Sequence, residues 1–252
     1  STVYRAVDGV HFVLHQAALP SVPRSIGDPV TTNEVNITGT LNVLIASRDR
    51  GVERVVFASS SSVYGNDPRQ PKHEDMRPRP MSPYAISKLA GEAYCSAFTR
   101  LYNLQTVILR YFNIFGPKQD PSSQYSAVIP KFLKVMQKNR RPTIYGDGKQ
   151  TRDFTFVENI VSANLHACEI EILPEESIFN CACGTQISVQ DLVVELNRIL
   201  GKDINPIFSD PRPGDVQHSY ADVSRAVHHL RFKPMVQFRE GLKRTVDWFS
   251  NH

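Results

Sequence analysis

The stretch RVVFASSSSVYG, residues 54–65, joins a run of apolar residues directly to four serines. Residues 54–58 predict a buried strand, which places the serines at its carboxyl end. Ligands of open parallel α/β sheets bind outside the carboxyl ends of the strands, where these hydroxyl groups would lie. The stretch therefore predicts a polar binding site at one edge of a parallel sheet.

The segments on either side of this stretch alternate between strand and helix patterns. Residues 11–14 and 104–110 predict two more buried strands. One helix is predicted over residues 28–51, with Asp28 as its cap, and a second over residues 82–102. Such an alternation favours an α/β fold, a parallel sheet with helices on both faces.

The pattern changes beyond Asn113, where short apolar segments near Ile144 and Phe154 replace the regular strands. Helices are predicted over residues 128–138, 157–169, 188–200 and 238–249, and a loop over residues 206–213. We therefore expect a smaller α/β lobe beside the sheet domain. The expected division is 1–112 and 153–184 for the sheet domain, and 113–152 and 185–252 for the lobe.

The composition is typical of a globular protein and excludes disordered and fibrous classes. Of 252 residues, 41% are hydrophobic and 21% are charged, and the net charge of +4 is spread along the chain. No apolar run approaches the roughly 18 residues that cross a bilayer, and no signal peptide is present, so we expect a cytoplasmic protein without membrane association. We also expect no nucleic-acid partner. The cysteine spacing does not match zinc knuckles, which predicts buried thiols and no bound metal.

Tyr84 and Lys88 stand four residues apart on the predicted helix 82–102, so their side chains share one face. A phenol, whose reference pKa is about 10, is a poor base at neutral pH, but a nearby cation favours the phenolate. A hydroxyl, a phenol and an ammonium group at a strand end could therefore move a proton to or from a substrate hydroxyl. The pair alone is equally compatible with an ordinary amphipathic helix.

Other motifs accompany the serine run and the Tyr84–Lys88 pair. They are LHQAA at 14–18, SVPRS at 21–25, RYFNIFG at 110–116, YGDG at 145–148, RDF at 152–154 and RPGD at 212–215. Each is weak by itself, but in this order they resemble the extended short-chain dehydrogenase/reductase family, and within it the NAD-dependent nucleotide-sugar 4-epimerases. The resemblance covers essentially the whole chain. It implies a Rossmann-like NAD-binding domain and a nucleotide-sugar-binding lobe.

The resemblance also implies roles for individual residues. Tyr84 would be the base, Lys88 would hold the nicotinamide ribose and lower the pKa of Tyr84, and Ser60 would relay the proton, with Ser62 also facing the sugar. The residues that would line NAD are Ala17, Ala18, Asn36, Tyr84, Lys88, Tyr111 and Phe112. The residues that would hold the UDP-sugar are Arg24, Asn113, Ala127, Val128, Tyr145, Arg152, Arg212, Asp215 and Ser219. Arginines suit a diphosphate because each guanidinium is a planar donor fork, although surface salt bridges would explain them as well.

One motif of the family, Gly-x-Gly-x-x-Gly, is absent from the sequence. By the resemblance, two βα units, on the order of 60 residues, are expected to be missing before the first strand. These units would carry the phosphate-binding turn and the acidic residue that selects NAD over NADP, so the choice of NAD rests on the family alone. We therefore expect the chain by itself to have little affinity for NAD and a bared sheet edge prone to association.

Three activities stay open from the sequence. The preferred one is interconversion of UDP-N-acetylglucosamine and UDP-N-acetylgalactosamine through a 4-keto intermediate, with UDP-glucose and UDP-galactose as a candidate second pair of substrates. In related epimerases the position matched by Ser219 walls the sugar pocket, and a small residue there leaves room for the 2-acetamido group; a register shift would put Tyr220 at that wall. A 4,6-dehydratase is disfavoured because serines replace its carboxylates. A non-catalytic nucleotide-sugar binder is the third possibility, since the Gly-rich motif is absent.

The resemblance further implies a homodimer. Its subunits would pair through the helices predicted at residues 28–50 and 83–102. Ala90, Ala93, Ala97 and Leu101 would supply a small-residue and apolar stripe at helical spacing. The same stripe could instead face the sheet.

Overall fold

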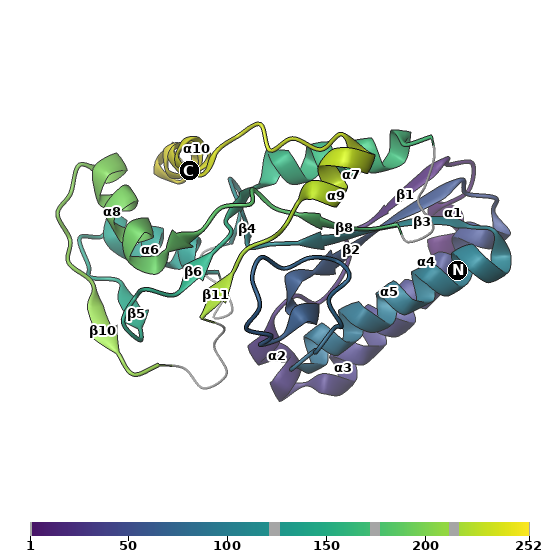
Figure 1. The fold of residues 1–252 in the computed structure, drawn as a ribbon, viewed down its shortest axis with the longest axis horizontal. Helices are drawn as coiled ribbons and strands as arrows, with labels where there is room; N and C mark the ends of the chain where they lie inside the picture. Colours follow the sequence, from purple (N-terminus) through teal and green to yellow (C-terminus); the bar gives the residue numbers. More distant parts are fainter. Residues whose placement is uncertain (1, 121–126, 172–176, 212–216, 252) are drawn as a thin grey trace.

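A four-stranded parallel sheet with the order β1-β2-β3-β8 lies at the centre of the protein (Figure 1). Our computed structural model describes residues 2–120, 127–171, 177–211 and 217–251. The strands of the sheet are β1 (Phe12–His15), β2 (Arg54–Ser60), β3 (Gln105–Tyr111) and β8 (Ile178–Cys181). The predicted strands are thus confirmed to within two residues. Ser60 is paired with Tyr111, which brings the carboxyl ends of β2 and β3 side by side.

Helices cover both faces of this sheet, as predicted (Figure 1). On one face lie α4 (Gly39–Asp49) and α5 (Pro83–Tyr102), and on the other lie α7 (Val157–Glu169) and α9 (Ser224–Leu230). Ser82 caps α5 by accepting a hydrogen bond from the Ala85 main-chain N at 3.1 Å. Gly91 lets α5 approach β2 closely, because a Cβ atom there would lie 2.4 Å from the Phe57 ring. This close approach carries the middle of α5 under the carboxyl end of β2.

The helix expected over residues 28–51 is confirmed in its extent, but a π-helical turn interrupts it. The structure has α3 (Pro29–Asn33), a π-helical turn (Glu34–Thr38) and then α4. Asp28 caps α3 as predicted, since its carboxylate accepts from the Thr31 main-chain N at 3.0 Å. The π-helical turn contains Asn36, whose buried side chain bonds partners outside the helix. Wide turns of this kind occur mostly as single interruptions of α-helices, often near functional sites.

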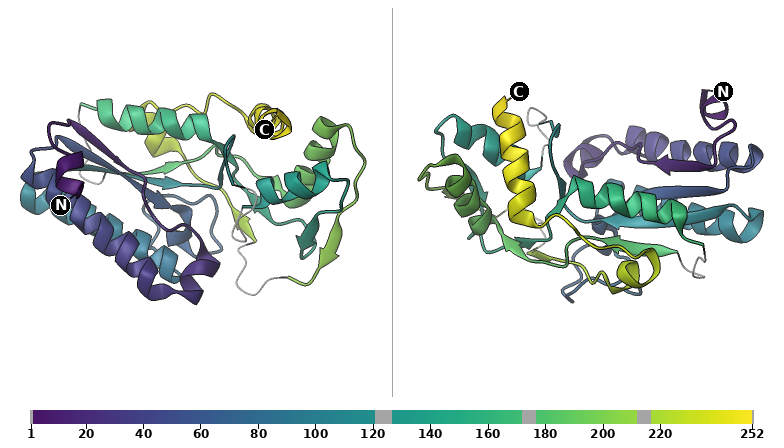
Figure 2. Two further views of the ribbon diagram at one scale, coloured as in Figure 1. Left: turned by 180° about the vertical axis from the view of Figure 1, so that it is seen from behind. Right: turned by 90° about the horizontal axis from the view of Figure 1, so that it is seen from above.

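A smaller lobe of short strands and helices lies beside the sheet (Figure 2). Its helices are α6 (Val128–Gln137), α8 (Val189–Leu200) and α10 (Phe238–Asn251). Its strands are β4 (Ile114–Phe115), β5 (Thr143–Tyr145), β6 (Thr151–Arg152), β7 (Thr155–Phe156), β9 (Ile187–Ser188), β10 (Ile207–Ser209) and β11 (His218–Ser219). Phe115, Phe154, Phe156 and Phe238 pack as an aromatic centre of its core.

Several elements of the chain differ from expectation. We expect residues 206–213 to form a loop, but the structure places strand β10 within this range, in parallel pairing with β5. The short helices α1 (Thr2–Ala6), α2 (Val22–Gly27) and α9 are not evident from the sequence pattern. Cys95 and Cys181 are buried as predicted, whereas Cys168 and Cys183 are only half-buried. The proposed division of the chain into two domains stays a prediction.

Candidate active site

A cavity of about 420 Å³ opens at the carboxyl ends of β2 and β3. The sequence-predicted residues that line it are Ser60, Ser62, Tyr84, Tyr111, Asn113, Arg152 and Ser219. They come from the end of β2, the start of α5, the end of β3, and strands β6 and β11 of the lobe. The cavity therefore lies between the sheet and the lobe, and the structure brings the predicted proton-transfer residues and several predicted substrate residues together.

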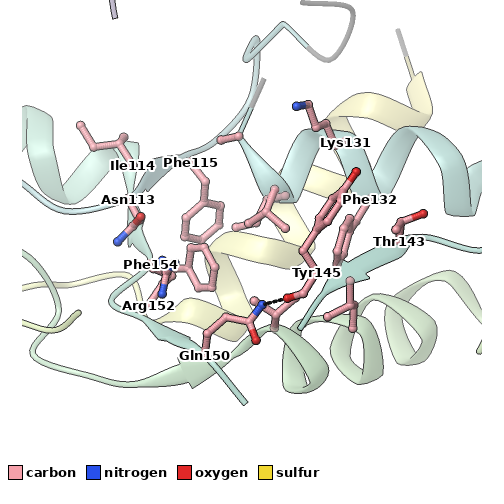
Figure 3. Close-up of a pocket in the computed structure, with 15 residues that line it drawn as sticks. Asn113, Ile114, Phe115, Lys131, Phe132, Thr143, Tyr145, Gln150, Arg152 and Phe154 are labelled. Carbon is pink, nitrogen blue, oxygen red and sulfur yellow. Dashed lines mark hydrogen bonds between the residues drawn. The ribbon is translucent and has the colours of Figure 1, made fainter. Parts of the chain in front are cut away.

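A second cavity, of about 300 Å³, adjoins the first one, because Asn113 and Arg152 line both. Ala127, Val128 and Tyr145 line it as well, as we predicted for the nucleotide part of the substrate. Figure 3 shows its aromatic lining, with Phe154 beside the Arg152 side chain, Phe115 next to Phe154, and Phe132 across the cavity near Tyr145. Gln150 closes one side, since its Nε2 donates to the Tyr145 carbonyl at 2.7 Å. The two cavities together can hold a ligand with one flat apolar end and one polar end.

The serine run forms a tight turn at the mouth of the first cavity. Residues Ser61–Tyr64 make a 3-10 helix, and the Ser60 Oγ caps it by accepting from the Ser62 main-chain N at 3.2 Å. The Ser62 Oγ is buried, and it has no hydrogen-bond partner in the described part of the chain. A buried hydroxyl without a partner costs about 1–3 kcal/mol. A polar ligand group in this cavity would remove that cost.

Lys88 and Tyr84 lie on one face of α5, as predicted, but they do not touch. The Lys88 Nζ donates to the Ala58 carbonyl at 2.8 Å and lies 6.0 Å from the centre of the Tyr84 ring. Burial raises the pKa of Tyr84 above its ordinary value of 10.0, and a hydrogen bond with Ser60 opposes the rise. Lys88 alone therefore does not lower the pKa of Tyr84 as we expected, because the Ala58 carbonyl holds the ammonium group away from the phenol.

Burial lowers the pKa of Lys88 from 10.5 to about 8, which predicts a pH-dependent stability. Below pH 8 the lysine is charged in both the folded and the unfolded chain, so the full cost of burying the charge is present. Between pH 8 and 10.5 the folded protein releases this proton while the unfolded chain keeps it, so stability rises by about 3 kcal/mol. Urea unfolding at several pH values measures this rise.

Lys88→Met should abolish the Lys88 contribution to this pH dependence, whereas Lys138→Met, at an exposed lysine, should leave it unchanged. The prediction would be contradicted if the free energy of unfolding rose equally with pH in the Lys88→Met variant and in the unsubstituted protein.

Some of the predicted cofactor-lining residues are accessible, and others are buried. Ala17 is exposed and Ala18 half-buried directly after β1, where short side chains leave the main chain open. Asn36 lies behind this turn, since its Oδ1 accepts from the Leu19 main-chain N at 2.7 Å and its Nδ2 donates to the Ser87 Oγ at 3.0 Å. It supports the turn rather than facing the cavity. The Phe112 side chain is fully buried in the core, against our expectation, because it points to the face opposite Tyr111.

One predicted substrate residue that the structure describes does not lie at the cavities. Arg24 is exposed on α2 and lines neither of them. Arg212 and Asp215 lie outside the described residues. Within the described ranges, every helix is either too short or too polar to traverse a lipid bilayer. The same ranges contain no group of three His, Cys, Asp or Glu side chains arranged to bind a metal ion.

Sequence reasoning missed two residues that shape the site. Lys72, which lines the first cavity, is fully buried and donates to the main-chain carbonyls of Asp67 and Arg69. The Asp153 carboxylate accepts from the main-chain N atoms of Cys183 and Gly184, at 3.0 Å each, and of Ala221 at 3.2 Å. Asp153 thereby joins the connection between β6 and β7 to two segments that are distant in the sequence, one at residues 183–184 and one at Ala221. The RDF motif at residues 152–154 could have pointed to Asp153, whereas none of the sequence motifs contains Lys72.

The chain is similar to known proteins in sequence and in fold. The profile of the NAD dependent epimerase/dehydratase family matches residues 1–182. The putative UDP-glucose 4-epimerase of Methanocaldococcus jannaschii is 38% identical over 244 residues, which are 96% of this chain and 78% of that protein.

Two solved structures are similar to this chain throughout. One is the UDP-N-acetylglucosamine 4-epimerase of Methanobrevibacter ruminantium in complex with UDP-N-acetylmuramic acid, with a TM-score of 0.95 and 39% identity over 100% of this chain and 80% of that one. The other is the Thermus thermophilus UDP-glucose 4-epimerase complex with NAD, with a TM-score of 0.87 and 37% identity over 98% of this chain and 81% of that one.

Proposed function

The chain belongs to the NAD-dependent epimerase/dehydratase family, and from this premise we propose that it interconverts UDP-N-acetylglucosamine and UDP-N-acetylgalactosamine. The similarity to its relatives identifies the chain as an NAD-dependent UDP-sugar 4-epimerase, and our proposal concerns which sugar it acts on. The observation that supports this choice is the place of Ser219 in the wall of the cavity that also holds Ser60 and Tyr84. A small side chain there leaves space for a 2-acetamido group.

The residues at the carboxyl ends of β1 and β2 fit NAD. The main chain at Ala17 is open, the Lys88 ammonium is near the cavity, and the Ser62 hydroxyl lacks a partner among the described residues. When bound, NAD supplies the hydride-transfer chemistry at the sugar C4. Lys88 would hold the ribose, and its positive charge would favour the phenolate form of Tyr84.

The chain itself supplies the proton transfer and the grip on the substrate. Tyr84 takes the proton of the C4 hydroxyl, and Ser60, which bonds the phenol, relays it. The same proton returns after the 4-keto sugar has turned to present its other face. Arg152 lies between the two cavities, so its guanidinium suits the diphosphate that links sugar and nucleoside. The aromatic cavity then receives the uracil ring.

A 4,6-dehydratase is the alternative within the family. Elimination of water needs an acid and a base beside the tyrosine. No Asp or Glu is among the described residues that line the first cavity. The cavity therefore favours epimerisation.

The choice of sugar can be tested with Ser219→Tyr. In a form of the protein that binds NAD, we expect turnover of UDP-N-acetylglucosamine without the substitution, and a loss of about 10- to 100-fold in kcat/KM for this sugar in the variant, because extra atoms in a packed site cost about 1–3 kcal/mol. Turnover of UDP-glucose should change less. Ser224→Tyr, at an exposed serine outside the cavity, is the matched control. If Ser219→Tyr keeps its activity on the N-acetylated sugar, Ser219 does not wall the pocket.

We also propose that the protein forms a homodimer through α4 and α5. Ala93 and Leu101 are exposed on α5 and Ala90 is half-buried, so the apolar stripe faces away from the sheet. A second copy would bury this stripe. Light scattering should give the mass of two chains, and Leu101→Lys should reduce it to one. A monomeric unsubstituted protein would refute the dimer.

A further inference from the structure

The strand that carries Ser219 is held along both edges by different parts of the chain. On one edge, β11 pairs in parallel with β6, and the Asp153 main-chain N donates to the Ser219 carbonyl at 2.9 Å. On the other edge lies the loop of residues 67–72, which follows the serine run. The Lys72 main-chain N donates to the Tyr220 carbonyl at 2.9 Å, and the Asp222 main-chain N donates to the Lys72 carbonyl at 2.8 Å.

Within this loop, Gln70 reaches both neighbours of Ser219. Its Nε2 donates to the His218 carbonyl at 2.6 Å, and its Oε1 accepts from the Tyr220 main-chain N at 3.4 Å. One carboxamide thus spans the peptide groups on either side of Ser219. Gln70 does not line the cavity, whereas Ser219 does. An effect of Gln70 on a sugar bound in this cavity would therefore be indirect, through the strand that carries Ser219.

The loop that carries Gln70 is a firm base for these contacts. The Arg69 Nε and Nη2 atoms donate to the two carboxylate oxygens of Asp67 at 3.0 and 2.7 Å. The buried Lys72 ammonium binds two main-chain carbonyls of the same loop. A side chain anchored on such a loop can fix the position of the strand that it contacts.

We propose that Gln70 is a positioning residue that fixes Ser219 in the wall of the sugar cavity and thereby contributes to the choice between 2-acetamido and 2-hydroxyl sugars. The inference rests on the proposed function, because it assigns Ser219 to the sugar. Without Gln70, the wall is held at this point by β6 and by the main-chain bonds of Lys72. A displaced wall fits the larger acetamido group less well, while the proton-transfer residues stay in place on β2 and α5.

Gln70→Met tests the proposal, because methionine has a similar size and makes neither hydrogen bond. For UDP-N-acetylglucosamine we expect KM to rise by about three- to tenfold with kcat unchanged, in keeping with the modest net contribution of one or two hydrogen bonds. For UDP-glucose we expect little change, so the ratio of the two kcat/KM values falls. Gln70→Glu, which keeps only the acceptor, should act in the same direction and provides a second variant if Gln70→Met does not fold.

Two controls separate positioning from general loosening. Arg77→Met, at an exposed arginine seven residues further along the chain than Gln70, should leave the ratio unchanged. In the Ser219→Tyr background, Gln70→Met should have a different effect on the ratio, because both changes act on one wall. If kcat/KM falls equally for both sugars, or does not change, the inference is overturned while the proposed function stands. If the unsubstituted protein holds NAD and turns over neither sugar, both are overturned.

Discussion

Tyr84→Phe is expected to lower kcat for epimerisation by about 100- to 10,000-fold, the usual contribution of a general acid or base. The substitution removes one oxygen atom and leaves the ring, the helix α5 and the cavity walls in place. Because Tyr84 does not line the second cavity, where we propose that the nucleotide binds, the affinity for UDP should change little. The loss should therefore appear in kcat rather than in the affinity for nucleotide.

Steady-state kinetics on the preferred UDP-sugar, together with calorimetric binding of UDP, measures the two effects separately. Ser60→Ala should cost less than Tyr84→Phe, because the phenol can still reach the substrate directly or through water. Tyr102→Phe removes the hydroxyl of an exposed tyrosine on the same helix and should leave kcat unchanged. Turnover by Tyr84→Phe at the level of the unsubstituted protein would exclude Tyr84 as the proton acceptor.

The parts of the fold that were predictable are those set by local patterns. Continuous apolar runs identify β2 and β3, and the capping residue Ser82 marks the start of α5. The Tyr84–Lys88 spacing places both side chains on one helix face whatever surrounds them. These features depend on neighbours in the sequence, and the structure confirms them.

The missed features depend on partners that are distant in the sequence. The RYFN motif does not say which face of β3 is the core, so the burial of Phe112 becomes evident only from its packing against Tyr64. The π-helical turn contains Asn36, whose contacts to Leu19 and Ser87 span tens of residues. Gln70 bonds strand β11 across about 150 residues, and nothing beside it in the sequence announces this contact.

A buried ion pair below the active site holds the elements together and gives a second large expected effect. The Arg110 Nε and Nη2 atoms donate to the two Glu92 carboxylate oxygens at 2.9 and 2.7 Å, and each side chain is only 3% exposed. The Ser59 hydroxyl donates to the same carboxylate. The Arg110 Nη1 donates to the Tyr64 hydroxyl at 2.9 Å, which in turn donates to the Asn180 Oδ1 at 2.7 Å.

This network joins β2, α5, β3 and β8 directly behind the residues that line the cavity. Ser59 precedes Ser60, Glu92 lies one turn beyond Lys88, and Arg110 precedes Tyr111. Because side chains alternate along a strand, the network occupies the inner face while the neighbouring residues reach the cavity. Its loss would therefore change both the stability of the sheet and the placement of the site.

Glu92→Leu is expected to lower the free energy of unfolding by about 3–5 kcal/mol, because it leaves the Arg110 guanidinium buried without its counter-charge. Arg110→Met should cost a similar amount by leaving the carboxylate alone. The double variant Glu92→Leu/Arg110→Met should lose less than either single variant, since two apolar side chains of similar volume avoid the burial of an unpaired charge. Lys243→Met breaks an exposed pair with Asp247 and should cost less than about 1 kcal/mol. Urea unfolding of the four variants measures these differences, and a double variant that loses the sum of the single losses would show that the pair acts through packing and not through charge.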